Sequence, residues 1–251
     1  MERQFHDIYY LGPLREYPGR LYSWAGERPA DVGRRGERTV EALLAADVQH
    51  DGKLKDPDTN KPHTVTQHVA YWLKRLGLIH SFKLKPIAHN RKEYEVKVQQ
   101  SPGAAEVALT DVGFGISQVL PVLTLCFYAP AGSTIIFEQP EIHLHPAVQA
   151  GLADVFLDAI KQRGIQIILE SHSEHLLHRL QLRIAEEEAS VDDLKLYFAQ
   201  ANDGECSLTE LDLDEYGNIR NWPKNFFGDS IGDLVKMTQV ALKRKLEQAA
   251  K

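Results

Sequence analysis

The pattern of apolar and polar positions changes near residue 111. In the segment that follows, short strands that are apolar throughout alternate with apolar or amphipathic helices. The strands are expected at 133–137 and 165–170, and the helices at 113–125, from Pro146 onward and from about 174 to Glu188. Strands of this kind are typical of a parallel sheet, so we expect an α/β layer in which both strands are buried on both faces.

Before residue 111 the pattern is mixed. Its expected elements are, in order, a strand at 6–11, an arginine- and glycine-rich loop to about Gly36, a helix at 37–46, a polar linker at 50–63, a helix at 64–76, and alternating segments at 81–89, 93–100 and 105–110. Alternation of apolar and polar positions predicts antiparallel strands with one face toward water.

The end of the chain predicts a smaller group of elements. They are a strand pair at 194–200 and 206–214, an aromatic turn at 222–227 that packs on the core, and an amphipathic helix from about Asp229. The chain as a whole is thus expected to form one unit over 1–251. Its parts are a mixed region at about 1–110, an α/β core at about 111–190, and a strand pair with a helix at about 191–251.

Charge and cysteine content narrow the class of protein. The formal net charge is −6, which is not the electrostatic signature of a nucleic-acid binder, so any DNA contact is expected to be local or indirect. The segment 15–38 contains six arginines and four acids. This modest excess of positive charge is explained better by a solvated loop than by phosphate contact. The two cysteines, Cys126 and Cys206, have no metal-ligand spacing, and no apolar run reaches the length of a membrane span. These features predict a cytoplasmic protein without a membrane partner.

Two side chains stand directly after the predicted parallel strands. Glu138 closes the first apolar run, and His172 follows the second between two serines. Ligands of open parallel sheets bind at the carboxyl ends of the strands, because loops and helix N-termini converge there. A carboxylate at this edge can hold Mg²⁺ through water, and a histidine can hydrogen-bond a terminal phosphate. The pair therefore indicates a nucleotide site.

The segment 113–118 has the composition of an anion-binding turn. Gly113 and Gly115 let the backbone approach a ligand, and Ser117 opens a helix whose free N–H groups favour a phosphate. On this interpretation the side chain of Ser117 is exposed. A glycine turn in front of a buried helix explains the same residues equally well.

Taken together, 113–172 resembles the second half of an ABC-class ATPase head, as found in the SMC, RecF and overcoming-lysogenization-defect families. Segment 113–118 is similar to the signature motif, 135–140 resembles Walker B, Leu144 and His145 fall at the D-loop, and His172 looks like the switch histidine. The resemblance implies an α/β, P-loop NTPase-like parallel sheet with flanking helices. This chain would form a partial ABC-class head that includes an antiparallel strand region.

A bacterial group of AAA-type, RecF-like ATPases is more similar still. Its members carry YLGPLR, VGFGxSQVLPVL, EQPExHLHP, ESHSEHLL and DEYGxIxNWPxxFF, which stand here at 10–15, 112–123, 138–146, 170–177 and 214–227. The resemblance covers nearly the whole chain. It implies ATP as the ligand and Mg²⁺ held by Glu138. The residues expected to bind the nucleotide are Gly113, Gly115, Ser117, Gln118 and His145.

The chain departs from the family pattern in its phosphate loop. No GxxxxGK(S/T) segment occurs in the 251 residues. The cradle for the β-phosphate and the hydroxyl ligand of Mg²⁺ would then come from a separate chain or from a segment missing here. The expected partner is a second copy in a homodimer or a partner ATPase chain. We therefore expect ATP hydrolysis only in an assembled complex.

A second departure concerns the catalytic position. The class has Asp-Glu at the end of Walker B, whereas this chain has Glu138 and Gln139. The amide of Gln139 can orient water but cannot take its proton. Glu141 is the expected substitute for the base, and His172 completes the expected catalytic set.

Two other functions stay open at this point. The chain could be a scaffold lobe that has lost catalysis, which Gln139 and the missing phosphate loop would support. It could also be a metal-dependent nuclease built on the histidines around His143 and His175, although no HExxH order and no DxD pattern occurs. The resemblance itself implies a role in DNA maintenance or phage defence.

Overall fold

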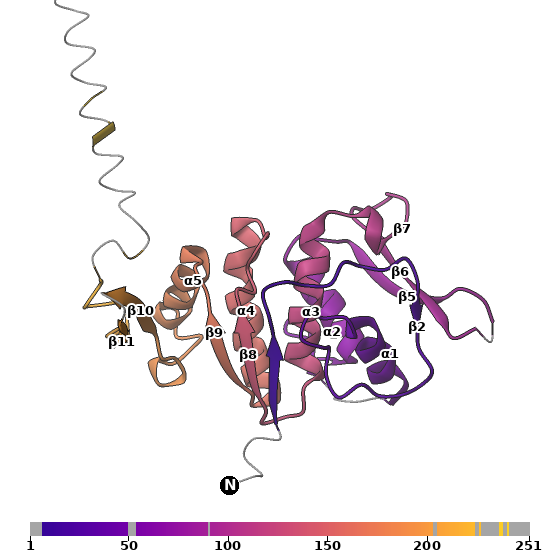
Figure 1. Cartoon of the computed structure of the whole chain (residues 1–251), viewed down its shortest axis with the longest axis horizontal. Coiled ribbons are helices and arrows are strands. Elements are labelled where there is room, and N and C mark those ends of the chain that lie inside the picture. The colour runs from indigo at the N-terminus through magenta and orange to yellow at the C-terminus, as the bar shows by residue number, and fades with distance from the viewer. Residues whose placement is uncertain are drawn as a thin grey trace, which may run out of the picture. The chain divides into compact units, whose positions relative to one another are not determined.

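The computed structural model of the chain describes residues 7–49, 54–89, 91–202 and 205–223, together with residues 226, 236, 237 and 240. The chain forms two compact units, residues 1–180 and 181–251 (Figure 1). The helix expected from Asp229 lies outside the described residues, except for residues 236, 237 and 240, which are helical.

A three-stranded parallel sheet lies in the first unit. Its strands are β1 (Ile8–Leu11), β8 (Thr134–Glu138) and β9 (Gln166–Glu170), in the order β1-β8-β9. Both neighbouring pairs are parallel, with Leu11, Phe137 and Leu169 in register. The expected class of an α/β protein with a parallel sheet and flanking helices is confirmed, and the two strands that carry the candidate site residues are adjacent.

Helix α4 (Pro146–Arg163) connects β8 to β9 and covers one face of this sheet. Pro146 stands at the first helical position, and Gly164 ends the helix in the left-handed conformation with φ 61°. The ring of Phe137 stacks on Phe156 of α4 at 5.5 Å between centroids, and Phe137 is fully buried. Helix α5 (Glu174–Ala185) follows β9, and Ser173 caps it by accepting the amide N–H of Leu176 at 3.1 Å.

Three further helices pack against one another in the same unit. They are α1 (Thr39–Gln49), α2 (Val65–Arg75) and α3 (Phe114–Tyr128). Thr64 and Gln67 form a capping box at the start of α2, as the pattern S/T-x-x-E/Q predicts. Every residue of α3 from Ile116 to Tyr128 is buried, so α3 lies at the centre of this helical group.

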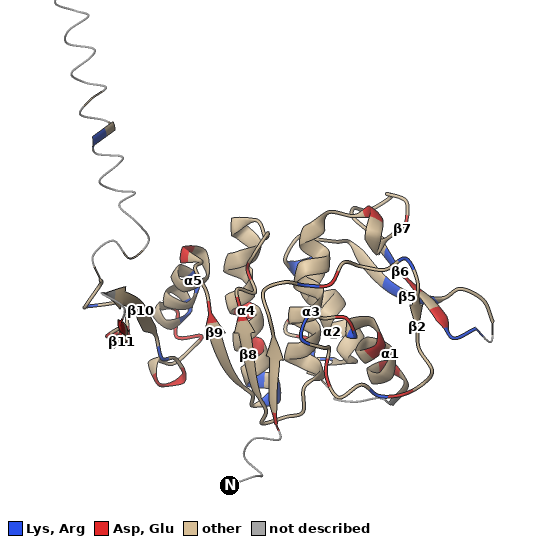
Figure 2. Cartoon of the chain, viewed as in Figure 1, with Lys and Arg blue, Asp and Glu red and all other residues tan. Residues whose placement is uncertain are grey.

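An antiparallel sheet stands beside the helices. It consists of β2 (Tyr22–Ser23), β6 (Glu93–Gln99) and β5 (Ser81–Pro86), with β7 (Val107–Ala108) also paired to β6 and a 3₁₀ turn after it at Leu109–Asp111. Lys83 and Lys85 both pair with Glu106, at 2.6 and 2.5 Å, on the side of the sheet that faces water. Figure 2 shows such mixed charges along β5 and β6. The expected antiparallel region with one wet face is confirmed, and β2 adds a strand inside the arginine-rich loop.

Two elements differ from the expectation. The polar linker contains a small hairpin, β3 (Leu54–Lys55) and β4 (Pro62–His63), because Asp56 accepts the amide N–H groups of Asp58 and Thr59 and closes the turn. The expectation that β9 is buried on both faces is wrong. This strand ends the sheet, and the side chain of Ile168 is 51% exposed.

The second unit is built on a hairpin of β10 (Tyr197–Asn202) and β11 (Glu205–Glu210), preceded by a 3₁₀ turn at Val191–Asp193. The expected strand pair is confirmed. The rings of Trp222 and Phe198 each contact Phe226, at 5.1 and 5.0 Å between centroids, so Phe226 of the expected aromatic turn packs on the hairpin. Residues 224, 225 and 227 of that turn lie outside the described residues. No helix among the described residues is both long and apolar enough to cross a membrane.

Candidate functional site

The carboxyl ends of β8 and β9 bring four of the polar residues together. Glu138 and Glu170 are register partners on the two strands. Gln139 follows Glu138 with φ 44°, a left-handed conformation that is uncommon for a residue with a side chain. In this conformation the Gln139 backbone donates to the Glu170 carbonyl at 2.9 Å, and its side-chain amide lies 3.5 Å from the Glu170 carboxylate.

His172 points away from the protein at the same edge. Its side chain is 79% exposed, and Nε2 lies 3.3 Å from Oε1 of Glu170, a contact that becomes an ion pair only when the histidine is protonated. Such an exposed side chain is available to a ligand. Its expected contact with a terminal phosphate stays a prediction.

Glu141 lies behind this edge and not on its surface. The residue is only 6% exposed, and its Oε1 accepts the backbone N–H of His172 at 2.8 Å. A carboxylate that is buried and already hydrogen-bonded is poorly placed to take a proton from a water molecule that attacks a nucleotide. In this state Glu141 instead ties the end of β8 to the end of β9.

Three residues that the sequence analysis did not assign also lie at this edge. Glu170 ends β9, Tyr10 is in β1, and Arg15 is 5% exposed in the segment after β1. Burial raises the pKa of Tyr10, and a hydrogen bond with the Glu138 side chain raises this pKa further. The signal for Glu170 was available in its place at the end of an apolar strand. Arg15 closes the segment YLGPLR at 10–15 that carries the family resemblance, which sets it apart from the five arginines that follow it.

The signature-like segment forms the first turns of α3. The helix begins at Phe114 with Gly113 as its N-cap, so Ser117 stands in the second part of the first turn and does not open the helix. Its hydroxyl donates to the carbonyl of Phe114 at 2.7 Å, and the residue is 6% exposed. The expected exposure of Ser117 is therefore wrong, because the side chain turns back onto its own helix. Gln118 is buried as well.

The start of α3 nevertheless lies beside the loop that follows β8. The ring of Phe114 contacts the ring of His143 at 5.3 Å between centroids, and Leu144 is the nearest neighbour of Gly115. Gly113 has open space around it, and no side chain caps the helix there. The first turn of α3 thus lies beside the loop 139–145.

His145 has a structural task in that loop. It is the N-cap of α4, and its Nδ1 accepts the amide N–H of Ala147 at 3.3 Å. The side chain is otherwise exposed. Its expected contact with a nucleotide stays a prediction.

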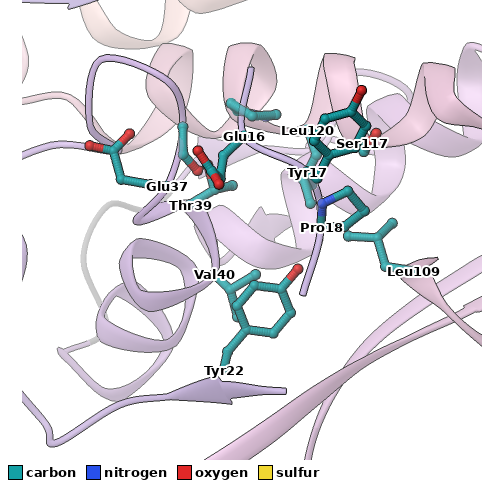
Figure 3. Close-up of a pocket in the computed structure, with 12 residues that line it drawn as sticks. Glu16, Tyr17, Pro18, Tyr22, Glu37, Thr39, Val40, Leu109, Ser117 and Leu120 are labelled. Carbon is teal, nitrogen blue, oxygen red and sulfur yellow. The ribbon is translucent and has the colours of Figure 1, made fainter. Parts of the chain in front are cut away.

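A small cavity of about 70 Å³ lies on the other side of Ser117 (Figure 3). Ser117 and Leu120 line it from α3, and Glu16 and Glu37 are also among its lining residues. The volume is too small for a nucleotide, so the cavity does not serve as the nucleotide site.

The residues present suit a magnesium ion held mainly through water. Among the described residues no three His, Cys, Asp or Glu side chains come together as a metal cage. Magnesium keeps several of its waters and usually takes one or two carboxylates along with substrate phosphates. Glu138 and its register partner Glu170 can supply such carboxylates.

Two family models match parts of the chain. The model of a family described as "AAA domain, putative AbiEii toxin, Type IV TA system" matches residues 42–178, and a second, described as "Protein of unknown function (DUF3696)", matches 190–237. The first match contains α3, β8 and the end of β9. It confirms the AAA-type ATPase assignment and supports an ATPase-like function. No curated protein matches the chain.

Solved structures of SMC ATPase heads are also similar. One, from a study of ATP-driven dimerization and DNA-stimulated activation of SMC ATPases, has 15% identity and TM-score 0.46, with 59% of this chain and 83% of that chain covered. A head with an extended coiled coil bound to the C-terminal domain of ScpA, from Pyrococcus furiosus, has 16% identity and TM-score 0.43, with 59% and 34% covered. An SMC head bound to the C-terminal winged-helix domain of ScpA has 13% identity and TM-score 0.49, with 71% and 51% covered. This chain thus spans about half or less of the length of two of the three.

Proposed function

The chain belongs to this AAA-domain family, and on that premise we propose that it forms one half of an ATP site. The half consists of the carboxyl ends of β8 and β9 together with the first turn of α3. A phosphate loop from outside the 251 residues completes the site. Nucleotide bound between the two halves would then hold the assembly together, and hydrolysis would release it.

One observation carries the proposal. Glu138, Gln139, Glu170 and His172 meet at the carboxyl edge of two adjacent parallel strands. This is the edge at which open α/β sheets bind ligands. Three of the four are polar groups with open sides, since Glu170 and His172 are exposed and Glu138 is half-buried.

Each residue receives a task from its position. Glu138, with Glu170 beside it, would hold Mg²⁺ through water, and the ion would neutralise charge on the phosphates. His172 would donate a hydrogen bond to a terminal phosphate, and Gln139 would orient the attacking water. The amides at the start of α3 would face a phosphate of the nucleotide, with Gly113 leaving the space for it.

The partner in this proposal is another ATPase chain that carries the phosphate loop, and a homodimer forms the site only if a segment outside these 251 residues supplies that loop. The cellular setting implied by the resemblance, DNA maintenance or phage defence, is part of the same proposal. A scaffold lobe without catalysis is the competing function. It differs in a testable way, because a scaffold has no reason to bind Mg-ATP at the edge of β8 and β9.

The proposal is tested on the isolated 28.3 kDa chain by ¹⁵N chemical-shift mapping with Mg-ATP at millimolar concentration. We expect weak binding, with Kd above about 10 μM or −7 kcal/mol, because the loop that cradles the phosphates is absent. Amides at 113–115, 138–139 and 170–172 should shift. No hydrolysis above background is expected.

Controls separate metal-dependent binding from adventitious contact. Chelation of Mg²⁺ with EDTA, or the substitution Glu138→Gln, should remove most of the shifts at 138–139 and leave those at the start of α3. Amide shifts confined to the residues that line the cavity beside Ser117, or no amide shifts at all, would favour the scaffold function. A Kd well below 10 μM would show that the chain needs no second half.

A further inference from the structure

One carboxylate connects the ends of β8 and β9. Oε1 of Glu141 accepts the backbone N–H of His172 at 2.8 Å, and Glu141 itself is almost fully buried. This hydrogen bond fixes the backbone from which the exposed imidazole projects. A charged carboxylate in the interior is costly unless a positive group or several hydrogen bonds compensate it. Its second oxygen, Oε2, is buried without a hydrogen-bond partner among the described residues.

The compensating charge comes from the third strand of the sheet. Arg15, in the segment after β1, is 5% exposed, and its Nη1 donates to the carbonyl of Gly12. Burial lowers the pKa of Arg15 to about 10, and the nearby charge of Glu141 opposes this shift, followed by that of Tyr10. The guanidinium therefore stays protonated at neutral pH and within electrostatic range of Glu141. Its Nε and Nη2 are buried without a partner in the described part of the chain.

We propose that Arg15 is a positioning residue of the candidate site: its buried positive charge stabilises the Glu141 carboxylate, which in turn holds the backbone amide of His172. The three residues follow β1, β8 and β9 in turn. Arg15 and Glu141 are both buried at this edge with polar atoms that lack a hydrogen-bond partner among the described residues, and Glu141 holds the amide of His172. This proposal rests on the proposed function in one respect, which is that His172 binds a phosphate of the nucleotide.

The arrangement distinguishes Arg15 from the arginines after it. Arg20, Arg35 and Arg38 pair with acids at the surface, where water already solvates both charges. Arg15 forms no such ion pair in the described part of the chain. The charge that most raises its pKa is that of Glu141, the carboxylate that accepts the His172 amide. Loss of its charge should therefore be felt at His172, across the sheet, and not only in its own loop.

The experiment measures hydrogen exchange of the His172 amide by NMR in the full chain without nucleotide. In Glu141→Gln the amide loses a charged acceptor, so its exchange should become about 10- to 100-fold faster, as expected for the loss of a hydrogen bond to a charged group. Arg15→Met should accelerate the same amide by a similar factor. The double variant should exchange no faster than Glu141→Gln alone, because both changes act through one carboxylate.

Arg163 provides the matched control. It also donates to a backbone carbonyl, that of Ala129 at 2.6 Å, its Nε is also buried without a partner among the described residues, and burial lowers its pKa. It stands at the end of α4, away from the strand ends. Arg163→Met should lower stability and leave exchange at His172 unchanged relative to the amide of Val155 in α4.

Two outcomes would overturn the proposal. The first is normal protection of the His172 amide in folded Arg15→Met while Glu141→Gln loses it. If Arg15→Met fails to fold, Arg15→Lys decides: lysine keeps the charge, so protection should persist, and its loss in a folded Arg15→Lys chain would show that charge is not the cause. Since the experiment uses no nucleotide, its failure is distinct from failure of Mg-ATP to shift the strand-end amides.

Discussion

At the scale of single residues, burial and hydrogen bonding distinguish side chains of the same type at the candidate site. Glu138, Glu141 and Glu170 are all acids at strand ends, but only Glu141 is buried and engaged by a backbone amide. Glu170 is exposed between Gln139 and His172. A general base has to reach the water that it activates, and burial keeps Glu141 from the exposed edge where such a water would stand.

Ser117 and Gly113 give a prediction at this scale. Ser117→Arg should destabilise the chain by more than about 2 kcal/mol, because a guanidinium would be forced into a buried position that faces its own helix. Gly113→Arg should cost about 1 kcal/mol or less, since a Cβ atom added there meets no atom within 4 Å and φ is −58°. Urea unfolding followed by circular dichroism compares the two. Equal stability of both variants would mean that Ser117 is exposed in solution.

At the scale of elements, β8 and β9 have similar apolar sequences and different surroundings. β8 lies in the middle of the sheet, with Ile135 and Phe137 fully buried. β9 ends the sheet and has no buried residue along its length. A parallel sheet is normally covered on both faces. The strand β9 is therefore more apolar than its exposed position at the end of the sheet requires.

A matched pair of substitutions measures this difference. Ile135→Ala should cost about 2–5 kcal/mol of unfolding free energy, because it opens a cavity in a fully buried position. Ile168→Ala, one strand away, should cost about 1 kcal/mol or less, because the side chain is already half in water. Denaturant midpoints at constant m-value give both numbers. Similar costs would indicate that the outer face of β9 is covered in solution.

At the scale of the whole molecule, charge limits the partners that the chain can bind alone. The net charge is −6, and Lys83, Lys85 and several arginines are already paired with acids. Binding to DNA without sequence preference requires basic groups that replace counterions on the phosphates. Figure 2 shows basic and acidic positions interspersed along the ribbon of the described residues.

The isolated chain should therefore bind duplex DNA with Kd weaker than about 10⁻⁴ M at about 150 mM salt. Fluorescence anisotropy with a labelled duplex tests this, and repetition at about 50 mM salt reveals any weak phosphate contact by its salt dependence. Tight, salt-sensitive binding would show that the chain has a basic surface despite its net negative charge. It would contradict the expectation that any DNA contact is indirect.

Local signals in the sequence were sufficient for most elements. The capping box at Thr64, the proline and glycine around α4, and the apolar runs of β8 and β9 each act within a few residues, so they predict helices and strands without knowledge of the fold. The hairpin β3–β4 was missed because the side chain of Asp56, and not an apolar pattern, closes its turn. The meeting of Glu138 with His172 also followed from the sequence, because parallel strands end at one edge.

Only the tertiary structure decided which of the polar residues face water. Ser117 is buried because α1 and α2 pack around α3, and Glu141 is buried because the strand ends close over it. Arg15 and Glu141 stand 126 positions apart in sequence, and β1 has to pair with β8 before their charges interact. Burial and long-range charge depend on distances across the fold, which the order of residues along the chain does not contain. The sequence by itself determined the elements and the edge at which the site lies, and packing determined which side chains that edge presents.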